Sequence, residues 1–153
     1  MIVGVGVDVV DVARVRRMVE RWGDRTLRRF LTPRERRYVS RQVHPAEHLA
    51  ARIAAKEAVV KAFGDSCAGR LTWRTIEVAR NVRGRPDIRL LGAARGLLAA
   101  PAVGHRSLHV SLTHTHTHAA ANVILVADEV PEGSSRGSRG RITQKRRVHG
   151  SPS

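Results

Sequence analysis

The segment 46–63, AEHLAARIAAKEAVVKAF, constrains the fold of this chain more than any other. It is rich in alanine, contains neither glycine nor proline, and is followed by Gly64, a residue that suits the C-cap of a helix. We therefore expect one long helix. Small side chains surround its charged residues and allow another element to pack closely: Ala50, Ala51, Ala54, Ala55 and Ala58.

The N-terminal segment 2–10, IVGVGVDVV, alternates in the manner of a β-strand. Valines fall on one face, and Gly4, Gly6 and Asp8 fall on the other. Because glycine weakens a strand, the pair indicates that something approaches the backbone beside Asp8. A functional site, a bulge and tight packing against a helix all explain such an approach.

The remaining patterns alternate between the periods of helices and strands. We expect helices at 11–29, 33–40 and 92–100, and strands at 73–81, 87–91, 107–113 and 119–127. In the strand 107–113, leucine and valine face inward, whereas His109 and Ser111 face outward. This order predicts an α+β domain in which an antiparallel sheet packs on the long helix.

The length and net charge of the chain limit its domain organisation and the kinds of partner that it can bind. At 153 residues the chain has room for one domain, which we place at 1–130, and its net charge is +15. The basic segment 131–153 has little to bury, and we expect it to be disordered. Such a charge attracts nucleic acid, anionic lipid or an acidic protein. A basic nucleic-acid-binding module is the alternative function, although two Trp, two Phe and one Tyr offer few rings for stacking bases.

The single cysteine and the lengths of the apolar segments indicate in which cellular compartment the protein is expected. Cys67 has no partner for an internal disulfide and fits a reducing environment. No stretch approaches the ~20 apolar residues that a membrane helix needs. We therefore expect a soluble, cytoplasmic protein that is not associated with a membrane.

The long helix also carries four charged residues close together: Arg52, Lys56, Glu57 and Lys61. Glu57 and Lys61 are four positions apart, so an exposed ion pair within the helix is the plain explanation. The cations outnumber the carboxylate, however, as is typical where phosphate oxygens supply the negative charge.

Five blocks in order, GVGVDVV, RIAAKEAVVKAFG, WRTIEV, RGRP and HVSLTHT, resemble the holo-acyl-carrier-protein synthase family, the small trimeric class of 4′-phosphopantetheinyl transferases. The resemblance covers residues 2–127 and implies the fold of that family. It further implies that the chain transfers the 4′-phosphopantetheine arm of coenzyme A to a serine of an apo acyl carrier protein and releases 3′,5′-ADP. Such a reaction serves fatty acid biosynthesis and lipid metabolism.

The resemblance also implies roles for individual residues. Asp8 and Glu57 correspond to the family's two Mg²⁺ ligands, which suits an ion that takes one or two carboxylates and completes its shell with water and phosphate. Together with Lys61 they are the expected catalytic residues; Glu57, Lys61 and a metal-bound water all remain candidates for the base. The expected contacts to coenzyme A are Arg52, Lys61, His109 and Ser111.

The same resemblance implies a binding partner for the arginine-rich region. The family's first helix supplies a basic docking surface for the acidic carrier protein, and four arginines at helical spacing match it: Arg14, Arg17, Arg21 and Arg25. The family forms homotrimers with active sites between subunits, and we expect the same here.

Some features depart from the family. The run His114-x-His116-x-His118 invites a zinc interpretation, but only His114 has a family counterpart. The turn after the long helix is Asp65-Ser66-Cys67-Ala68-Gly69, where relatives have a short Thr-Gly turn. Relatives often place basic residues at the positions of His44 and Pro45.

Overall fold

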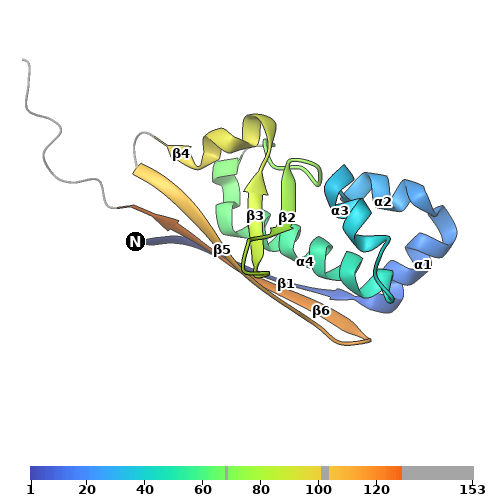
Figure 1. Cartoon of the computed structure of the whole chain (residues 1–153). Coiled ribbons are helices and arrows are strands. Elements are labelled where there is room, and N and C mark those ends of the chain that lie inside the picture. Colours follow the sequence, from blue (N-terminus) through green and yellow to red (C-terminus); the bar gives the residue numbers. More distant parts are fainter. Residues whose placement is uncertain (68, 101–103, 129–153) are drawn as a thin grey trace, which may run out of the picture.

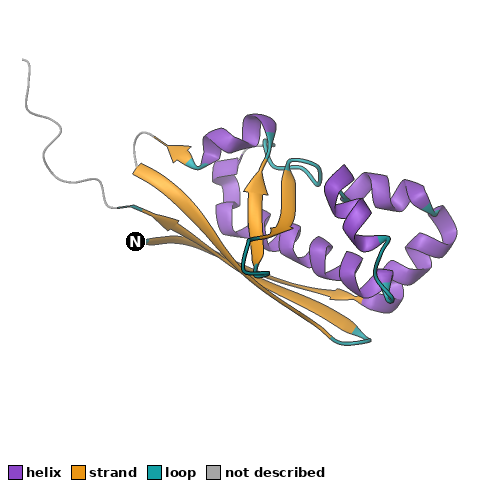
Figure 2. Ribbon diagram, in the orientation of Figure 1, coloured by secondary structure: helices purple, strands orange, loops and turns teal. Residues whose placement is uncertain are grey.

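A computed structural model describes residues 1–67, 69–100 and 104–128 of the chain (Figure 1). The α-helices follow the first strand and precede the other strands. Figure 2 distinguishes the helices, in purple, from the strands, in orange. The helices are α1 (Val12–Trp22), α2 (Asp24–Phe30), α3 (Pro33–Val39), α4 (Pro45–Phe63) and two short 3₁₀ helices, η1 (Gly64–Cys67) and η2 (Gly92–Leu97). The strands are β1 (Ile2–Asp11), β2 (Ile76–Arg80), β3 (Pro86–Leu90), β4 (Ala99–Ala100), β5 (Gly104–His114) and β6 (His118–Ala127). The predicted basic segment 131–153 lies outside the described residues.

The strands form two antiparallel sheets. The larger sheet has the order β1-β6-β5-β4, and β2 pairs with β3 in a separate hairpin. Helix α4 runs along one face of the larger sheet, and α1, α2 and α3 gather at one end of it (Figure 1). The predicted α+β architecture, with an antiparallel sheet packed on the long helix, is confirmed. The prediction did not anticipate that β2 and β3 would stand apart from the main sheet.

The two glycines of β1 face α4 at very short range. A Cβ atom at Gly4 would lie 2.0 Å from the carbonyl oxygen of Ala62, and one at Gly6 would lie 1.9 Å from that of Ala58. Real Cβ atoms do not make contacts under 3.0 Å. Tight packing against a helix, one of the explanations that the sequence leaves open, is therefore realised, and it also explains why α4 carries alanine at these positions. The register of β1 on β6 also shifts between Ile2 and Gly4, as a bulge would produce.

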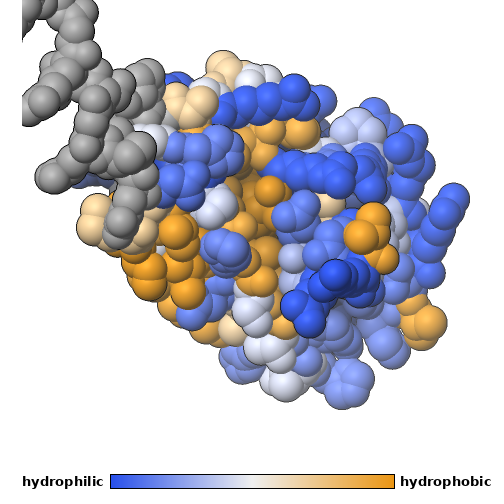
Figure 3. All heavy atoms as spheres, turned by 60° about the vertical axis from the view of Figure 1, so that its left-hand side comes forward, coloured by the Kyte–Doolittle hydropathy of each residue, from blue (hydrophilic) through white to orange (hydrophobic). Residues whose placement is uncertain are grey.

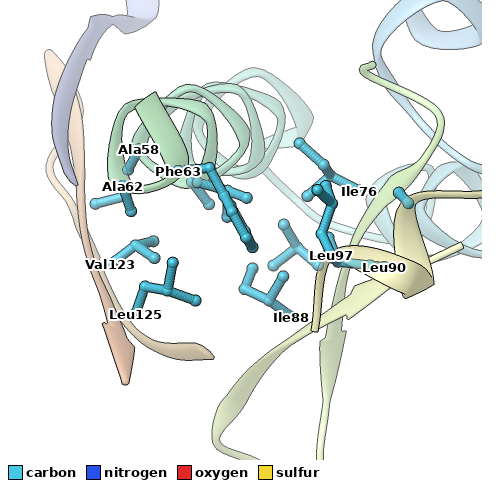
Figure 4. Packing of buried hydrophobic residues seen from close by; sticks show 14 of the residues in the cluster. Ala58, Ala62, Phe63, Ile76, Ile88, Leu90, Leu97, Val123 and Leu125 are labelled. Atoms are coloured by element: carbon cyan, nitrogen blue, oxygen red, sulfur yellow. The ribbon is translucent and has the colours of Figure 1, made fainter. Parts of the chain in front are cut away.

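Two apolar clusters hold the layers together. The first joins the second half of α4 to the inner face of the sheet and to the β2-β3 hairpin, with Phe63 between Leu125 on one side and Leu97 on the other (Figure 4). The second joins the first half of α4 to α1 and α3 through Leu49, Val12 and Val39. Residues with small or branched aliphatic side chains make up most of both clusters, in keeping with a chain that is poor in aromatic residues.

The helical prediction for 11–29 is wrong in one respect, because the chain breaks at Gly23. This glycine adopts φ +53° and ends α1 through its backbone N–H, which donates to the carbonyl of Val19 at 2.7 Å. Positive φ is available to glycine without a steric penalty. A second helix, α2, then starts at Asp24.

Two further boundaries differ from the sequence prediction. The predicted strand 73–81 begins only at Ile76, because the hydroxyl and backbone of Thr75 are bonded to Thr72 in a turn. The predicted helix 92–100 is a 3₁₀ helix that ends at Leu97 and is followed by the short strand β4. The start of α3 is as predicted, with Pro33 as its first residue. The backbone N–H of Glu35 donates to the Thr32 hydroxyl, and the backbone N–H of Thr32 donates to the Glu35 carboxylate, which together form a capping box.

Candidate active site

Asp8 and Lys61 bring β1 and α4 together at one point. Asp8 lies on the same face of β1 as Gly4 and Gly6, so the close packing of the strand on the helix carries its carboxylate to α4. The ammonium of Lys61 donates to Asp8 Oδ1 at 2.8 Å and to the carbonyl of Val7 at 3.0 Å. The Asp8 side chain is 18% exposed and that of Lys61 is 52% exposed, so both remain accessible to a ligand.

Glu57 lies one turn before Lys61 on α4 and is half-buried. The exposed ion pair between Glu57 and Lys61, which the sequence offers as the plain explanation, is not formed among the described residues; Lys61 pairs with Asp8 instead. Within the described ranges no group of three or more His, Cys, Asp or Glu side chains is arranged for a metal. A pair of carboxylates is nevertheless the usual protein contribution to a Mg²⁺ site, because water and phosphate supply the other ligands.

Lys56 is buried, although the sequence predicts it to be one of the cations available to phosphate. Its ammonium donates to Glu35 Oε2 at 2.7 Å, to the carbonyl of Phe30 at 2.8 Å and to that of Trp73 at 2.6 Å. Burial lowers the pKa of the Lys56 ammonium, and the carboxylate of Glu35 opposes that effect. Lys56 therefore ties α4 to the preceding helices and to the segment before β2, and it supplies no free charge to a ligand.

Arg52 is also buried, with 5% exposure, but it borders a cavity of about 170 Å³. Its guanidinium lies 4.2 Å from the centre of the Tyr38 ring, and its Nη1 donates to the carbonyl of His48 at 3.3 Å. Arg80 reaches the same ring from β2, and its Nη2 donates to the Tyr38 hydroxyl at 2.9 Å. Burial lowers the pKa of the Arg52 guanidinium, and Glu35 opposes this.

His109 and Ser111 lie on the opposite face of the sheet from Asp8. In the register of the three central strands, Ser111 stands beside Asn122 and then Val7, and His109 beside Ile124 and then Val5. Residues aligned across a sheet share a face, so His109 and Ser111 point to the valine side of β1. The alternation of 107–113 predicts that they face outward, but not which side of β1 they share. A single chain thus presents Asp8 on one face of the sheet, and His109 and Ser111 on the other.

The four arginines predicted for docking are all exposed, but they do not share one helix. Arg14, Arg17 and Arg21 lie on α1, whereas Arg25 follows the break at Gly23 and lies on α2. Arg25 borders a groove of about 620 Å³ between these helices.

Sequence reasoning missed several residues of this region. It assigned nothing to Tyr38 or Arg80 at the cavity, nor to Glu47, which accepts from His116 Nδ1 at 2.7 Å and lies 3.4 Å from His114 Nδ1. Helical spacing places Glu47 near His44 and His48, but only the tertiary fold adds the histidines of the β5-β6 turn. The capping box formed by Thr32 and Glu35 is a local feature, yet no local signal indicates that the same carboxylate receives Lys56.

Comparison with known proteins bears directly on this site. Residues 4–121 match the model of the 4′-phosphopantetheinyl transferase superfamily, a span that includes Asp8, Glu57, Lys61 and His109. The chain belongs to this superfamily. The resemblance inferred from the five sequence blocks is thereby confirmed.

The match to individual relatives extends over nearly the whole length of those relatives. A holo-[acyl-carrier-protein] synthase of Koribacter versatilis is 43% identical over 125 residues, which is 82% of this chain and 98% of the relative. The crystal structure of such a synthase from Neisseria meningitidis superposes with a TM-score of 0.72 at 30% identity, covering 84% of this chain and all of that one. The Helicobacter pylori synthase, solved in complex with coenzyme A, gives a TM-score of 0.67 at 26% identity and covers 80% and 99% of the two chains.

In the parts of the chain that the structure describes, no helix combines the length and the apolar character needed to cross a membrane.

Proposed function

We propose that this chain is a holo-[acyl-carrier-protein] synthase, which transfers the 4′-phosphopantetheine arm of coenzyme A to a serine of an apo acyl carrier protein. One observation carries the proposal: Lys61 joins the aspartate motif of β1 to the Lys-Glu helix α4 through its 2.8 Å contact with Asp8. These two motifs are far apart in the sequence, and the superfamily match spans both. The coenzyme A bound to the Helicobacter pylori relative supports the choice of donor.

Asp8 and Glu57 are the residues that would hold Mg²⁺. Their oxygens are the hard donors that this ion prefers, and the partial exposure of the Asp8 side chain leaves room for water and phosphate. When bound, the ion would neutralise charge on the diphosphate of coenzyme A. Lys61 engages Oδ1 of Asp8, and the carboxylate keeps further lone pairs with which it could hold an ion.

The reaction asks this chain mainly to position groups and to balance charge. The serine oxygen of the carrier forms a bond to the phosphorus next to the pantetheine arm, and the bond from that phosphorus to the bridging oxygen breaks. The electron pair leaves with 3′,5′-ADP, and the serine proton passes to a base. The Lys61 ammonium lies at the accessible end of the site and can contact the phosphates. The carboxylate of Glu57 can accept the proton directly, whereas Lys61 can accept it only as the neutral amine.

A second copy of the chain would complete the site. His109 and Ser111, the proposed contacts to coenzyme A, stand on the far face of the sheet from Asp8, so two copies are needed to bring both sets to one ligand. That face also bears Val5, Val7 and Val9, which are 56%, 52% and 59% exposed. Apolar surface gathers over the strands, whereas hydrophilic side chains cover the helical end (Figure 3). Burying such a face between copies supports the proposed homotrimer.

The carrier protein would dock on the exposed arginines of α1 and α2. Arg14, Arg17 and Arg21 project from α1, and Arg25 borders the groove beside it. Complementary charge would accelerate encounter with an acidic carrier and fix its orientation. We place the reaction in the cytoplasm, where a lone thiol such as Cys67 stays reduced.

A mass measurement tests the proposal. The purified chain is incubated with an apo acyl carrier protein, coenzyme A and Mg²⁺, and we expect the carrier to gain one phosphopantetheine. EDTA should abolish the gain, and Asp8→Asn or Glu57→Gln should lower the rate by at least about 100-fold, the order expected for loss of a metal ligand or a positioned base. Glu20→Gln, which removes an exposed carboxylate of α1, is the matched control. Carriers from fatty-acid, polyketide and peptide synthases that all stay unmodified would refute the proposal.

A further inference from the structure

The cavity beside Arg52 is surrounded by groups that carry, or can acquire, positive charge. Around the Tyr38 ring stand the Arg52 guanidinium at 4.2 Å, the Arg80 guanidinium at 5.3 Å and the His48 ring at 5.7 Å. The His48 ring also lies 5.1 Å from that of His114, and both line the cavity. The cavity is therefore a convergence point of side chains from α3, α4, β2 and β5.

The nearby carboxylates are already engaged. Glu35 is bonded to Lys56 and to the backbone N–H groups of Thr32 and Val78. Glu47 accepts from His116 and lies beside His114 and His44. Neither carboxylate makes an ion pair with Arg52 or Arg80 among the described residues, and Arg52 Nε, which is fully buried, has no hydrogen-bond partner there. Arg52 and Arg80 are thus not paired with these carboxylates, and such cations suit an anionic ligand.

His48 responds to these surroundings. Burial lowers the pKa of its imidazole, and the charges of His114, Arg52 and Arg80 lower it further, whereas Glu47 has the opposite effect. The ordinary pKa of histidine is about 6.5, so His48 is largely neutral at pH 7. A phosphate group in the cavity would offset both the burial and the neighbouring cations, because it would pair with the charged imidazolium.

We propose that His48 takes up a proton when a phosphate group binds between Arg52 and Arg80, so that this cavity binds phosphate more tightly as the pH falls through the titration range of histidine. The phosphate would belong to coenzyme A, and in this respect the inference rests on the proposed function. Proton uptake and pH-dependent binding are linked: each unit by which the ligand raises the pKa of His48 gives a tenfold gain in affinity at pH values well below the pKa of the ligand-free protein.

The experiment follows the imidazole C2–H signals of His48 by NMR from pH 5 to pH 8.5, with and without ligand. Two probes are used. Sulfate stays doubly charged across this range, so any change in its affinity comes from the protein, whereas 3′,5′-ADP reports on the complete nucleotide but itself takes up a proton near pH 6. We expect each probe to raise the titration midpoint of His48 by about 0.5–1 unit. Sulfate should then bind about two- to fivefold more tightly at pH 6 than at pH 8, because His48 is only partly protonated at pH 6.

Two variants separate this effect from general electrostatics. His48→Gln should lower the ratio of sulfate affinities at pH 6 and pH 8 clearly below that of the wild type. His105→Gln, which removes an exposed histidine at the start of β5, should leave the ratio as in the wild type. A His48 midpoint that neither probe moves, or an unchanged ratio in His48→Gln, would overturn the inference.

The failure of this inference can be distinguished from the failure of the proposed function. If the chain modifies an apo carrier but its His48 midpoint stays fixed, the inference fails and the transferase remains. If sulfate binds with proton uptake and no carrier is ever modified, the phosphate cavity stands and the transferase fails.

Discussion

The contact between β1 and α4 can be tested by adding a single methyl group. Gly6→Ala would place a Cβ atom 1.9 Å from the carbonyl oxygen of Ala58 and 2.8 Å from the backbone nitrogen of Ala62. Ordinary contacts begin near 3.4 Å, so strand and helix would have to separate by about 1.5 Å, the difference between these two distances. The obstructing atoms belong to the backbone in the middle of a helix and cannot rotate away.

The energetic cost follows from this displacement. Overpacking a core usually costs about 1–3 kcal/mol, and a gap of even 0.5–1 Å forfeits about a quarter to a half of each dispersion contact across it. Because the whole β1-α4 interface would be strained, we expect a loss at the upper end, about 3 kcal/mol. For a domain of this size that lowers the melting temperature by about 10–15 °C. The shift of Asp8 away from Lys61 should also reduce the rate of phosphopantetheine transfer.

Urea unfolding followed by circular dichroism measures the stability change. Gly96→Ala is the matched control, because Gly96 has no positive φ and its added Cβ would meet nothing within 4 Å; this variant should change stability by less than about 0.5 kcal/mol. If Gly6→Ala loses less than about 1 kcal/mol and keeps its transfer rate, the close approach of strand to helix is not what requires glycine here.

Two further predictions concern charged side chains. Lys56→Met leaves the buried Glu35 carboxylate without its cation and should lower the free energy of unfolding, measured in urea, by about 3–5 kcal/mol. Lys61→Met, at the exposed end of the same helix, should lower it by less than about 1 kcal/mol and yet impair phosphopantetheine transfer. Equal losses of stability in the two variants would contradict this assignment. The hydrogen bond from His116 holds the pKa of Glu47 below its ordinary 4.5, so stabilisation by this carboxylate is present above pH 4.5 and is lost as the pH falls through the lowered pKa. The stability difference between wild type and Glu47→Gln should therefore shrink on acidification from pH 5 to pH 3, and a difference independent of pH would exclude the interaction.

Local sequence signals determined the elements of this protein well. The alanine-rich segment predicted at 46–63 forms α4 from Pro45 to Phe63, because helix propensity and a C-terminal glycine act over short range. Strand alternation placed Asp8 on one face of β1, and His109 and Ser111 outward on β5, since side-chain direction depends only on the period of the strand. The break at Gly23 was missed because a glycine within a helical pattern is compatible with either continuation or termination.

Only the tertiary structure decided which charges are available. Lys56 and Lys61 are the same residue type on one helix, yet the side chain of the first is 1% exposed and paired with Glu35, and that of the second is 52% exposed and reaches Asp8. Likewise, the order β1-β6-β5 sets His109 and Ser111 on the side of the sheet away from Asp8. Burial, strand order and contacts between segments far apart in sequence are properties of the packed chain, so periodicity alone does not contain them.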